Sequence, residues 1–171
     1  MMPWQEFLAL DARLSQQLRV AEQPGWLRNL AIFFAHSGDS WFWLLALILV
    51  WWLGSPVLKT ITPIFAIAIF ITALVVFAVK FTVRRRRPEG EWGGIYRNTD
   101  PHSFPSGHAT RAALLAVLAI GLGPPWLAIL LGIWAPLVIL ARVVMGVHYL
   151  SDVLAGAVLG ILLGVAVLII L

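Results

Sequence analysis

Cysteine is absent from the 171-residue sequence, and charged side chains are scarce. The missing cysteine excludes disulfides, thiolate zinc sites, iron–sulfur clusters and a cysteine nucleophile together. Only 12% of the residues are charged, whereas 61% are hydrophobic and the mean hydropathy is +0.92. Soluble domains are roughly half apolar. The composition therefore predicts a protein that resides in the lipid bilayer.

A secretory signal peptide is also missing from the first residues, which carry neither a basic segment nor the apolar stretch that follows it in such peptides. We therefore expect membrane insertion to depend on the spans of the bundle itself. The net charge of +4 could indicate a nucleic-acid partner. The basic residues, however, cluster beside apolar segments and above all at 84–87. This placement favours an anionic group at the membrane surface over nucleic acid.

Long apolar segments predict an all-α fold, an integral membrane helical bundle. A helix needs about 20 apolar residues to cross a hydrocarbon core about 30 Å thick. Five segments approach that length and are the predicted spans: 41–53, 57–79, 109–122 with its flanking residues, 126–145 and 150–171. Polar residues at 37–40 interrupt the apolar stretch 26–54, so a sixth span before residue 57 stays open.

The first 25 residues have a different pattern from the spans. Apolar side chains recur at helical spacing from Phe7 to Leu18, with charged and amide side chains between them. This pattern predicts an amphipathic helix that lies in the membrane interface. We therefore interpret the chain as a single domain, 1–171, with an interfacial helix in 1–25 and the helical bundle in 26–171.

Charged residues stand at the ends of the predicted spans. A Lys, Arg or Asp at the centre of a bilayer costs roughly 2.5 to 3.5 kcal/mol, so the arginines at 84–87 belong to a loop outside the hydrocarbon, 81–105. If the chain crosses at every span, this loop and the polar residues of the neighbouring span ends fall on one face. The members of this set are Lys80, Arg87, Ser106, Gly107, His108, Arg142, His148 and Asp152. The sequence therefore predicts one site.

The cations of this set suit the binding of a phosphoryl group. Lys80, Arg87 and Arg142 can supply positive charge where a phosphoryl group spreads negative charge over its oxygens during transfer. Ser106 and Gly107 follow a proline and open a helix, whose unpaired N–H groups and dipole favour an anion. We therefore expect all five residues to contact a phosphate.

Two histidines and a carboxylate, His108, His148 and Asp152, add groups for proton transfer and nucleophilic attack. His148 and Asp152 are four residues apart, which on a helix places them on one face. A carboxylate bound to one ring nitrogen fixes the tautomer and frees the other nitrogen. No histidines and carboxylates have the spacing of metal ligands, so we expect neither a metal nor a cofactor.

At these residues the sequence resembles the type 2 phosphatidic acid phosphatase (PAP2) superfamily, which includes bacterial lipid phosphatases and vanadium haloperoxidases. The superfamily motif K-x6-R-P is present over residues 80–88, and P-S-G-H is present over residues 105–108. The motif S-R-x5-H-x3-D keeps its spacing over residues 141–152, with Ala141 in place of the usual serine. That departure puts one auxiliary hydrogen bond in doubt.

The resemblance implies a membrane lipid phosphatase that works through a phosphohistidine intermediate. It implies that His148 is the nucleophile, Asp152 its partner and His108 the general acid for the leaving oxygen. The residues that would bind the phosphate are Lys80, Arg87, Ser106, Gly107 and Arg142. Similar proteins act on undecaprenyl diphosphate, phosphatidylglycerophosphate or phosphatidate. The implied substrate is therefore a phosphate monoester or diphosphate of an isoprenoid or a glycerolipid.

Two other functions fit parts of the pattern. The same residues could bind vanadate, so a vanadate-dependent peroxidase is one alternative, although the relatives with that activity are soluble and this chain is mostly apolar helix. An anion or lipid transporter is the other, because several spans with a basic mouth could pass charged solutes. Transporters often bind their solute near the midplane and carry inverted repeats, whereas the polar residues here stand at one rim.

Two signals for the orientation in the cell membrane disagree. Eleven of the 12 basic residues fall on the predicted site face and only Lys59 on the other, which by the positive-inside rule puts the site in the cytoplasm. Several of these residues, however, are expected to bind phosphate. Similar bacterial phosphatases commonly face outward, so the resemblance implies an extracytoplasmic site.

A stripe of small residues runs along the last predicted span. Gly156, Gly160 and Gly164 recur every four residues, which lets another helix approach closely. The partner is either a helix of the same chain or a second copy. Internal packing and a homodimer are therefore both open.

Three polar residues outside the motifs also receive predicted roles. Asp39 precedes an apolar run, which is typical of a helix N-cap. Arg97 and His102 lie in the polar loop, where they could contact a lipid headgroup or face solvent.

Overall fold

The chain forms an all-α bundle. A computed structural model describes residues 3–20, 23–90, 92 and 100–171, and these residues contain seven α-helices. In chain order they are α1 (Pro3–Gln17), α2 (Trp26–Ser37), α3 (Ser40–Leu53), α4 (Pro56–Val83), α6 (Gly107–Leu122), α7 (Pro125–Val144) and α8 (Leu150–Ile170). The all-α fold class predicted from the apolar segments is confirmed.

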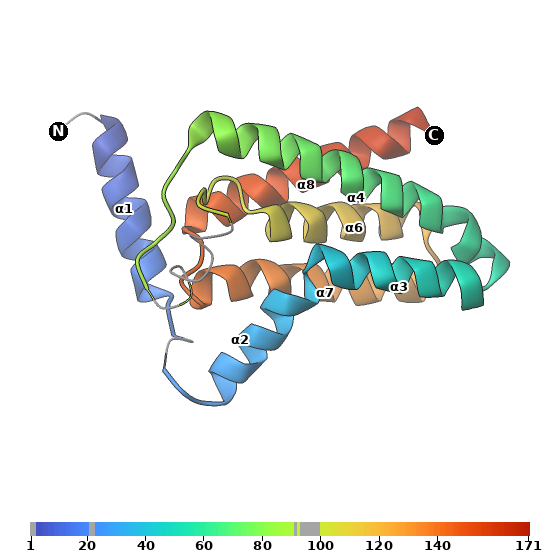
Figure 1. Cartoon of the computed structure of the whole chain (residues 1–171), viewed down its shortest axis with the longest axis horizontal. Helices are drawn as coiled ribbons and strands as arrows, with labels where there is room; N and C mark the ends of the chain where they lie inside the picture. Colours follow the sequence, from blue (N-terminus) through green and yellow to red (C-terminus); the bar gives the residue numbers. More distant parts are fainter. Residues whose placement is uncertain (1–2, 21–22, 91, 93–99) are drawn as a thin grey trace.

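Five helices, α3, α4, α6, α7 and α8, run along the long axis of the molecule (Figure 1). α1 and α2 lie at one end of this group. The C-terminus of α4 and the N-termini of α6 and α8 are at that same end. We call it the polar end, because the predicted site residues follow or precede these helix termini.

Three helices, α4, α7 and α8, are long and apolar enough to cross a membrane. α2 and α3 pass the same test only together, and they are bent by 61° at the break between them, so they add at most one candidate span. α6 has 16 residues, which at 1.5 Å per residue give about 24 Å, less than the hydrocarbon thickness of about 30 Å. Length and composition thus support three or four spans, and the count of five stays a prediction.

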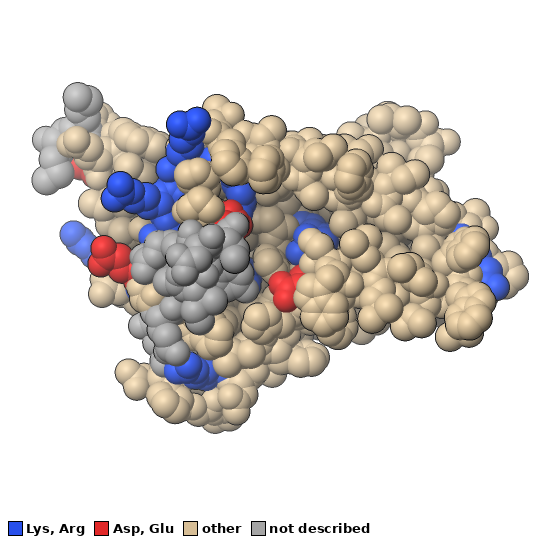
Figure 2. Space-filling model, in the orientation of Figure 1, with Lys and Arg blue, Asp and Glu red and all other residues tan. Residues whose placement is uncertain are grey.

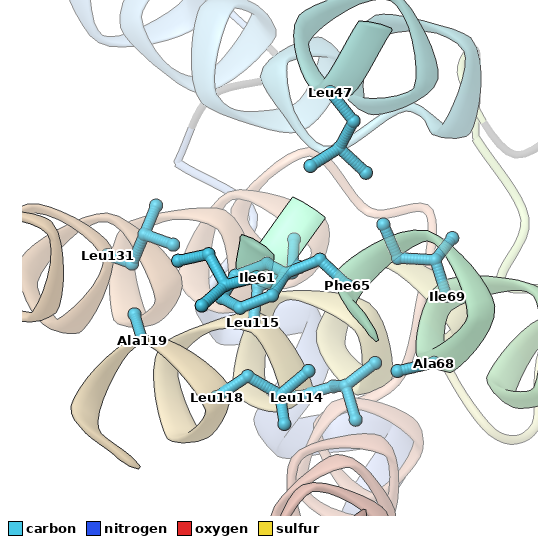
Figure 3. Close-up of a cluster of buried hydrophobic side chains, with 10 residues drawn as sticks. All are labelled: Leu47, Ile61, Phe65, Ala68, Ile69, Leu114, Leu115, Leu118, Ala119 and Leu131. Atoms are coloured by element: carbon cyan, nitrogen blue, oxygen red, sulfur yellow. The ribbon is translucent and has the colours of Figure 1, made fainter. Parts of the chain in front are cut away.

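A hydrophobic cluster joins α3, α4, α6 and α7 in the middle of the bundle (Figure 3). From α6 it contains Leu114, Leu115 and Leu118, which have no exposed surface. The outer helices keep large apolar residues on the surface, such as Phe70 of α4 and Ile133 of α7. Because lipid is as apolar as these side chains, close packing rather than exclusion from water holds such helices together. α6 is therefore the central helix of the bundle.

The glycine stripe of α8 packs against α6 within the monomer. A Cβ atom at Gly156 would lie 2.6 Å from the carbonyl oxygen of Ser106, and one at Gly160 would overlap the carbonyl oxygen of Thr110. At Gly164 a Cβ would meet an α6 side chain at 2.8 Å, and all three glycines are buried. Of the two partners left open for this stripe, the structure therefore supports a helix of the same chain, and it gives no evidence for a homodimer through these glycines.

α1 differs from the predicted interfacial helix in its length and in the residues it buries. The helix ends at Gln17, well short of the predicted 25 residues. Phe7 and Leu10 are exposed, as an amphipathic helix at a membrane surface requires. The residues buried against the bundle are Asp11 and Ser15. Polar rather than apolar contacts therefore attach α1, and its position in the interface stays a prediction.

Candidate active site

A cavity of about 700 Å³ opens at the polar end of the bundle. Residues of α3 and α4 line it, and Figure 2 shows the surface hollowed between these helices, with basic side chains visible in the recess. Six of the eight predicted site residues line it: Lys80, Arg87, Gly107, His108, Arg142 and His148. Ser106 and Asp152 do not line the cavity and are fully buried.

Two helix ends supply the first part of this site. Lys80 lies in the last turn of α4. Ser106 is the N-cap of α6, and its Oγ accepts a hydrogen bond from the N–H of Ala109 at 3.4 Å. The N–H of Ser106 donates to the carbonyl oxygen of Asp152 at 3.0 Å. The start of α6, with Gly107 as its first residue, is thus tied to the start of α8.

The turn between α7 and α8 supplies His148. Gly146 has a positive φ of 68°, a conformation that glycine adopts without strain. The N–H groups of Val147 and His148 both donate to the carbonyl oxygen of Arg142 at 3.2 Å, so the turn folds back on the end of α7. His148 therefore precedes the first residue of α8. The prediction that His148 and Asp152 share one face of a helix is corrected, because Asp152 belongs to α8 and His148 does not.

Arg87 fixes the tautomer of His148. Its Nη1 donates to the carbonyl oxygen of Val147 at 3.0 Å and lies 3.1 Å from Nε2 of His148. A guanidinium can only donate hydrogen bonds, so Nε2 is the acceptor and carries a lone pair. In the neutral ring the proton is therefore on Nδ1, which lies 3.5 Å from Oδ2 of Asp152. This arrangement leaves Nε2 as the nitrogen with nucleophilic character.

Asp152 is shared between several donors. Its Oδ2 accepts a hydrogen bond from the N–H of Tyr149 at 2.9 Å, and its Oδ1 accepts one from Nη1 of Arg85 at 2.8 Å. The 3.5 Å to Nδ1 of His148 is longer than an ordinary hydrogen bond. Catalytic hydrogen bonds are often long without substrate and shorten when it binds. Asp152 thus stands beside the ring nitrogen that carries the proton.

The surroundings of His148 keep its ring neutral. Burial lowers the pKa of His148 well below the ordinary 6.5, and the positive charges of Arg87, Arg142 and Lys80 lower it further. The negative charge of Asp100 opposes this but has a smaller effect. At neutral pH the imidazole is therefore unprotonated, as a nucleophile must be.

An acidic residue of the loop, Asp100, contacts two of the cations. Its Oδ2 accepts hydrogen bonds from Nζ of Lys80 and from Nη2 of Arg87, the latter at 2.7 Å. Nε of Arg87 also donates to its carbonyl oxygen at 2.6 Å. Burial raises the pKa of Asp100, but the hydrogen bond and charge of Lys80 and the charge of Arg87 outweigh burial and lower it below the ordinary 3.8. The sequence motifs do not include this anion.

His108 has an acidic partner that also lies outside the motifs. Its Nε2 is 2.7 Å from Oδ1 of Asp39, whose other oxygen is 3.1 Å from Nδ1 of His36. Asp39 occupies the N-cap position of α3 but makes no side-chain cap hydrogen bond. The predicted capping role is therefore corrected, because the carboxylate binds two histidines instead. Since 69 residues separate Asp39 from His108, no local pattern could reveal the pair.

A second polar cluster attaches α1 to the start of α8. Arg85 donates from Nη2 to Asp11 and from Nη1 to Ser151, both at 2.6 Å. Asp11 accepts the N–H of Ser151 at 3.0 Å, and Oγ of Ser15 accepts the N–H of Leu150 at 2.8 Å. These side chains satisfy N–H groups in the first turn of α8, which have no partner within the helix. In the sequence nothing distinguishes Arg85 from Arg84 and Arg86, which, like it, are not among the fixed residues of the motifs.

The remaining predictions concern metals and the polar loop. Within residues 3–20, 23–90, 92 and 100–171, no three His, Cys, Asp or Glu side chains are grouped so that they could hold a metal ion. The ring of His102 lies edge-on to Phe81 at 5.3 Å, and its contact with a headgroup stays a prediction. Arg97 lies outside the described residues.

Comparisons with known proteins agree with one another. The family description "PAP2 superfamily" matches residues 61–171. The chain is 32% identical over 155 residues to decaprenylphosphoryl-5-phosphoribose phosphatase of Mycobacterium tuberculosis, covering 88% of this chain and 84% of that one. It is 33% identical over 140 residues to undecaprenyl-diphosphatase of Sulfolobus acidocaldarius, covering 78% and 66%. The fold is similar to the crystal structure of a transmembrane PAP2-type phosphatidylglycerolphosphate phosphatase from Bacillus subtilis, with a TM-score of 0.73, 25% identity, and coverage of 95% and 84%.

Proposed function

The chain belongs to the PAP2 superfamily, and on this premise we propose that it hydrolyses a phosphate monoester or diphosphate of an isoprenoid lipid through a phosphohistidine. The relatives and the solved structure reported above are lipid phosphatases of this superfamily, and this multi-pass membrane protein is a lipid phosphatase as well. In the proposal His148 is the nucleophile, Asp152 orients it, and His108 is the general acid. The residues proposed to bind the phosphate are Lys80, Arg87, Ser106, Gly107 and Arg142.

One observation carries this proposal: four cations and two histidines line a cavity that also has an apolar wall. The apolar residues of that wall are on α4 and include Ile69, Ala73, Val76 and Phe77. Binding sites for small ligands are mostly apolar, with a few polar groups that fix the orientation. The combination suits a ligand with a phosphate at one end and a hydrocarbon chain directly beside it.

The first proposed step transfers the phosphoryl group to the protein. Nε2 of His148 attacks phosphorus, and the bond between phosphorus and the leaving oxygen breaks. His108 protonates that oxygen, so the lipid departs as an alcohol, or as a lipid monophosphate when the substrate is a diphosphate. Lys80, Arg87 and Arg142 balance the charge on the phosphoryl oxygens during the transfer.

The second proposed step releases inorganic phosphate. Water attacks the phosphohistidine, the bond between nitrogen and phosphorus breaks, and His108 takes a proton from the water. Both histidines then return to their starting protonation states. Asp152 stabilises the positive charge that the ring of His148 gains while phosphorus is attached, a role supported by its position beside Nδ1.

The isoprenoid substrate is supported by two relatives, whose names describe enzymes that act on a decaprenyl lipid and on undecaprenyl diphosphate. A glycerolipid phosphate is the second candidate, because the similar structure from Bacillus subtilis is a phosphatidylglycerolphosphate phosphatase. Phosphate release by the purified protein from undecaprenyl diphosphate, phosphatidylglycerophosphate and phosphatidate separates the two. We expect the highest kcat/KM for the isoprenoid, and a preference for a glycerolipid would replace the first candidate by the second.

We further propose that the chain crosses the membrane five times and that its site faces the extracytoplasmic side. The five crossings would be α3, α4, α6, α7 and α8. Lys80 at the end of α4 and Arg142 at the end of α7 line the same cavity, which supports a crossing by α6 between them. Local thinning of the bilayer can accommodate a helix as short as α6.

Trapping of the covalent intermediate tests the assignments of His148 and His108. The purified protein is mixed with lipid that carries ³²P in its terminal phosphate, quenched rapidly without acid, and analysed on an alkaline gel, because phosphohistidine survives base better than acid. We expect His148→Ala to abolish both turnover and retained label. His102→Ala, which changes a histidine that does not line the cavity, should still retain label.

The same experiment can contradict the proposal in two ways. If His148→Ala still retains label and His108→Ala does not, the nucleophile and the acid are reversed. If turnover is normal but the wild type never retains label, the phosphohistidine itself is wrong.

A further inference from the structure

We propose that Asp39 is the positioning residue for His108 and thereby controls proton transfer to the leaving lipid oxygen. The inference rests on the proposed role of His108 as the general acid. Oδ1 of Asp39 lies 2.7 Å from Nε2 of His108, and both residues line the cavity. An ionised carboxylate only accepts hydrogen bonds, so Nε2 carries a proton that points to Asp39. Nδ1 is therefore the nitrogen that exchanges a proton with the substrate.

Asp39 also supplies the negative charge that the acid form of His108 requires. The charged side chains near this ring are Arg111 of α6, Arg142 of α7 and Asp39 at the start of α3. The two arginines disfavour a positively charged ring, whereas Asp39 favours it. If Asp39 were neutral, the ring would lose the negative neighbour in this set, and the protonated form that donates the proton would be less populated than with the carboxylate in place.

Arg111 holds the turn that carries Asp39. Its Nε donates to the carbonyl oxygen of Gly38 at 2.9 Å, its Nη2 donates to the same oxygen, and its Nη1 donates to Oγ of Ser40 at 2.6 Å. Arg111 is only 7% exposed, so its charge is buried together with these partners. It follows His108 by three residues on α6 and lies on the same side of that helix. α6 thus carries both His108 and Arg111, the arginine that holds the turn with Asp39.

Two tryptophans hold the same turn. Nε1 of Trp43 donates to the carbonyl oxygen of Ser37 at 3.0 Å, and Nε1 of Trp134 donates to Oγ of Ser37 at 2.9 Å. The turn packs directly against the ring, because a Cβ atom at Gly38 would lie 3.0 Å from Cδ2 of His108. The bend between α2 and α3 is therefore fixed from α3, α6 and α7, with the carboxylate against His108.

The dependence of the rate on the leaving group separates this role from a purely structural one. p-Nitrophenol departs without protonation, whereas phenol needs a general acid. We expect Asp39→Asn to lower kcat/KM for phenyl phosphate about 10- to 100-fold, less than the roughly 10²- to 10⁴-fold of general acid catalysis because His108 itself remains, and that for p-nitrophenyl phosphate less than about threefold. kcat/KM covers the steps up to the departure of the alcohol, so hydrolysis of the phosphohistidine does not enter.

Two further variants complete the test. His36→Gln removes the other histidine that contacts Asp39 and should leave both substrates at wild-type rates. A double variant, Asp39→Asn with His108→Ala, should be no slower than His108→Ala alone, because Asp39 acts through His108. Retained cleavage of p-nitrophenyl phosphate also shows that Asp39→Asn is folded.

Three results would overturn the inference. The first is equal slowing of both substrates by Asp39→Asn, which is the result of a structural role. The second is additive losses in the double variant. The third is equal slowing of the cleavage of both substrates by His108→Ala. His108 would then not be the general acid, and the role of Asp39, which depends on it, would be wrong too. Only this third result contradicts the proposed function.

Discussion

Two carboxylates line a cavity that is proposed to bind an anion, and they have different partners. Asp39 contacts the imidazole of His108, whereas Asp100 contacts Lys80 and Arg87. An anion that binds to cations competes with any other anion for them. Asp100 is therefore expected to oppose substrate binding, while Asp39 is expected to act on proton transfer.

Asp100→Asn should increase the affinity for phosphate-like ligands. The variant keeps the size of the side chain but removes the charge that the substrate has to displace from Lys80 and Arg87. The side chain of Asp100 is 41% exposed, so the ion pairs are worth only roughly 0.5 to 1 kcal/mol. This corresponds to a two- to fivefold change, so we expect the inhibition constant of vanadate to fall by about that factor.

Glu89→Gln is the matched control for this prediction, because Glu89 is an exposed acid of the same loop that lines no part of the cavity. Inhibition by vanadate should be unchanged in that variant. A higher inhibition constant in Asp100→Asn would mean that Asp100 organises the cations for the substrate instead of competing with it.

The motif residues could be predicted from the sequence because spans alternate between the two faces of a membrane. That rule places Lys80, Arg142 and His148 at the same end without any knowledge of packing. Asp39 could not be found in this way, because it reaches His108 only through the 61° bend between α2 and α3. Arg111 was missed for the same reason, since its partners belong to that bend.

At the scale of elements, the contact between α6 and α8 joins two parts of the site. α6 begins with Gly107 and His108, and α8 carries Asp152 in its first turn. The glycines of α8 let the two backbones touch, and the N–H of Ser106 donates to the carbonyl oxygen of Asp152. The stripe could be predicted from the sequence, but its partner could not, because a glycine stripe lets a helix approach closely whether it belongs to the same chain or to a second copy.

Gly160→Ala should destabilise the protein and lower its activity. The added Cβ would overlap the carbonyl oxygen of Thr110, a backbone atom that cannot move aside alone. Overpacking of this kind costs about 1 to 3 kcal/mol, which corresponds to roughly 2 to 12 °C in the melting temperature of a protein of this size. Thermal unfolding in detergent measures the change.

Gly132→Ala provides the comparison, because Gly132 lies in α7 and a Cβ there would have no neighbour within 4 Å. Alanine is up to about 1 kcal/mol more favourable than glycine in a helix, so this variant should be as stable as the wild type or more so. Equal melting temperatures for the two variants would mean that α6 and α8 are less closely packed than described here.

At the scale of the whole molecule, most of the basic side chains visible in Figure 2 lie at the polar end, although some blue side-chain atoms are also visible at the opposite end. The positive-inside rule reads such a distribution as a cytoplasmic face. Lys80 and Arg87, however, are engaged by Asp100, and Arg85 is engaged by Asp11 and Asp152. Residues bound in this way serve the site and the fold, so we give more weight to the extracytoplasmic face proposed above.

Cysteine labelling in intact cells measures the orientation, and the natural absence of cysteine makes single substitutions clean probes. Glu89 is exposed at the polar end, and Ser55 is exposed at the opposite end of α4. We expect a membrane-impermeant maleimide to label Glu89→Cys in intact cells and Ser55→Cys only after lysis. The reverse pattern would place the site in the cytoplasm.

The recess between α4 and α3 has a consequence for the kinetics of the reaction. Apolar residues of α4 and four cations line the same cavity, so we expect a lipid that binds there to enter from the bilayer, in which it diffuses in two dimensions. The rate then follows the mole fraction of substrate among the lipids and not its amount per volume of water. Dilution with inert lipid slows the enzyme even when the total substrate is constant. The dephosphorylated lipid stays in the bilayer, while the released phosphate diffuses into the surrounding water.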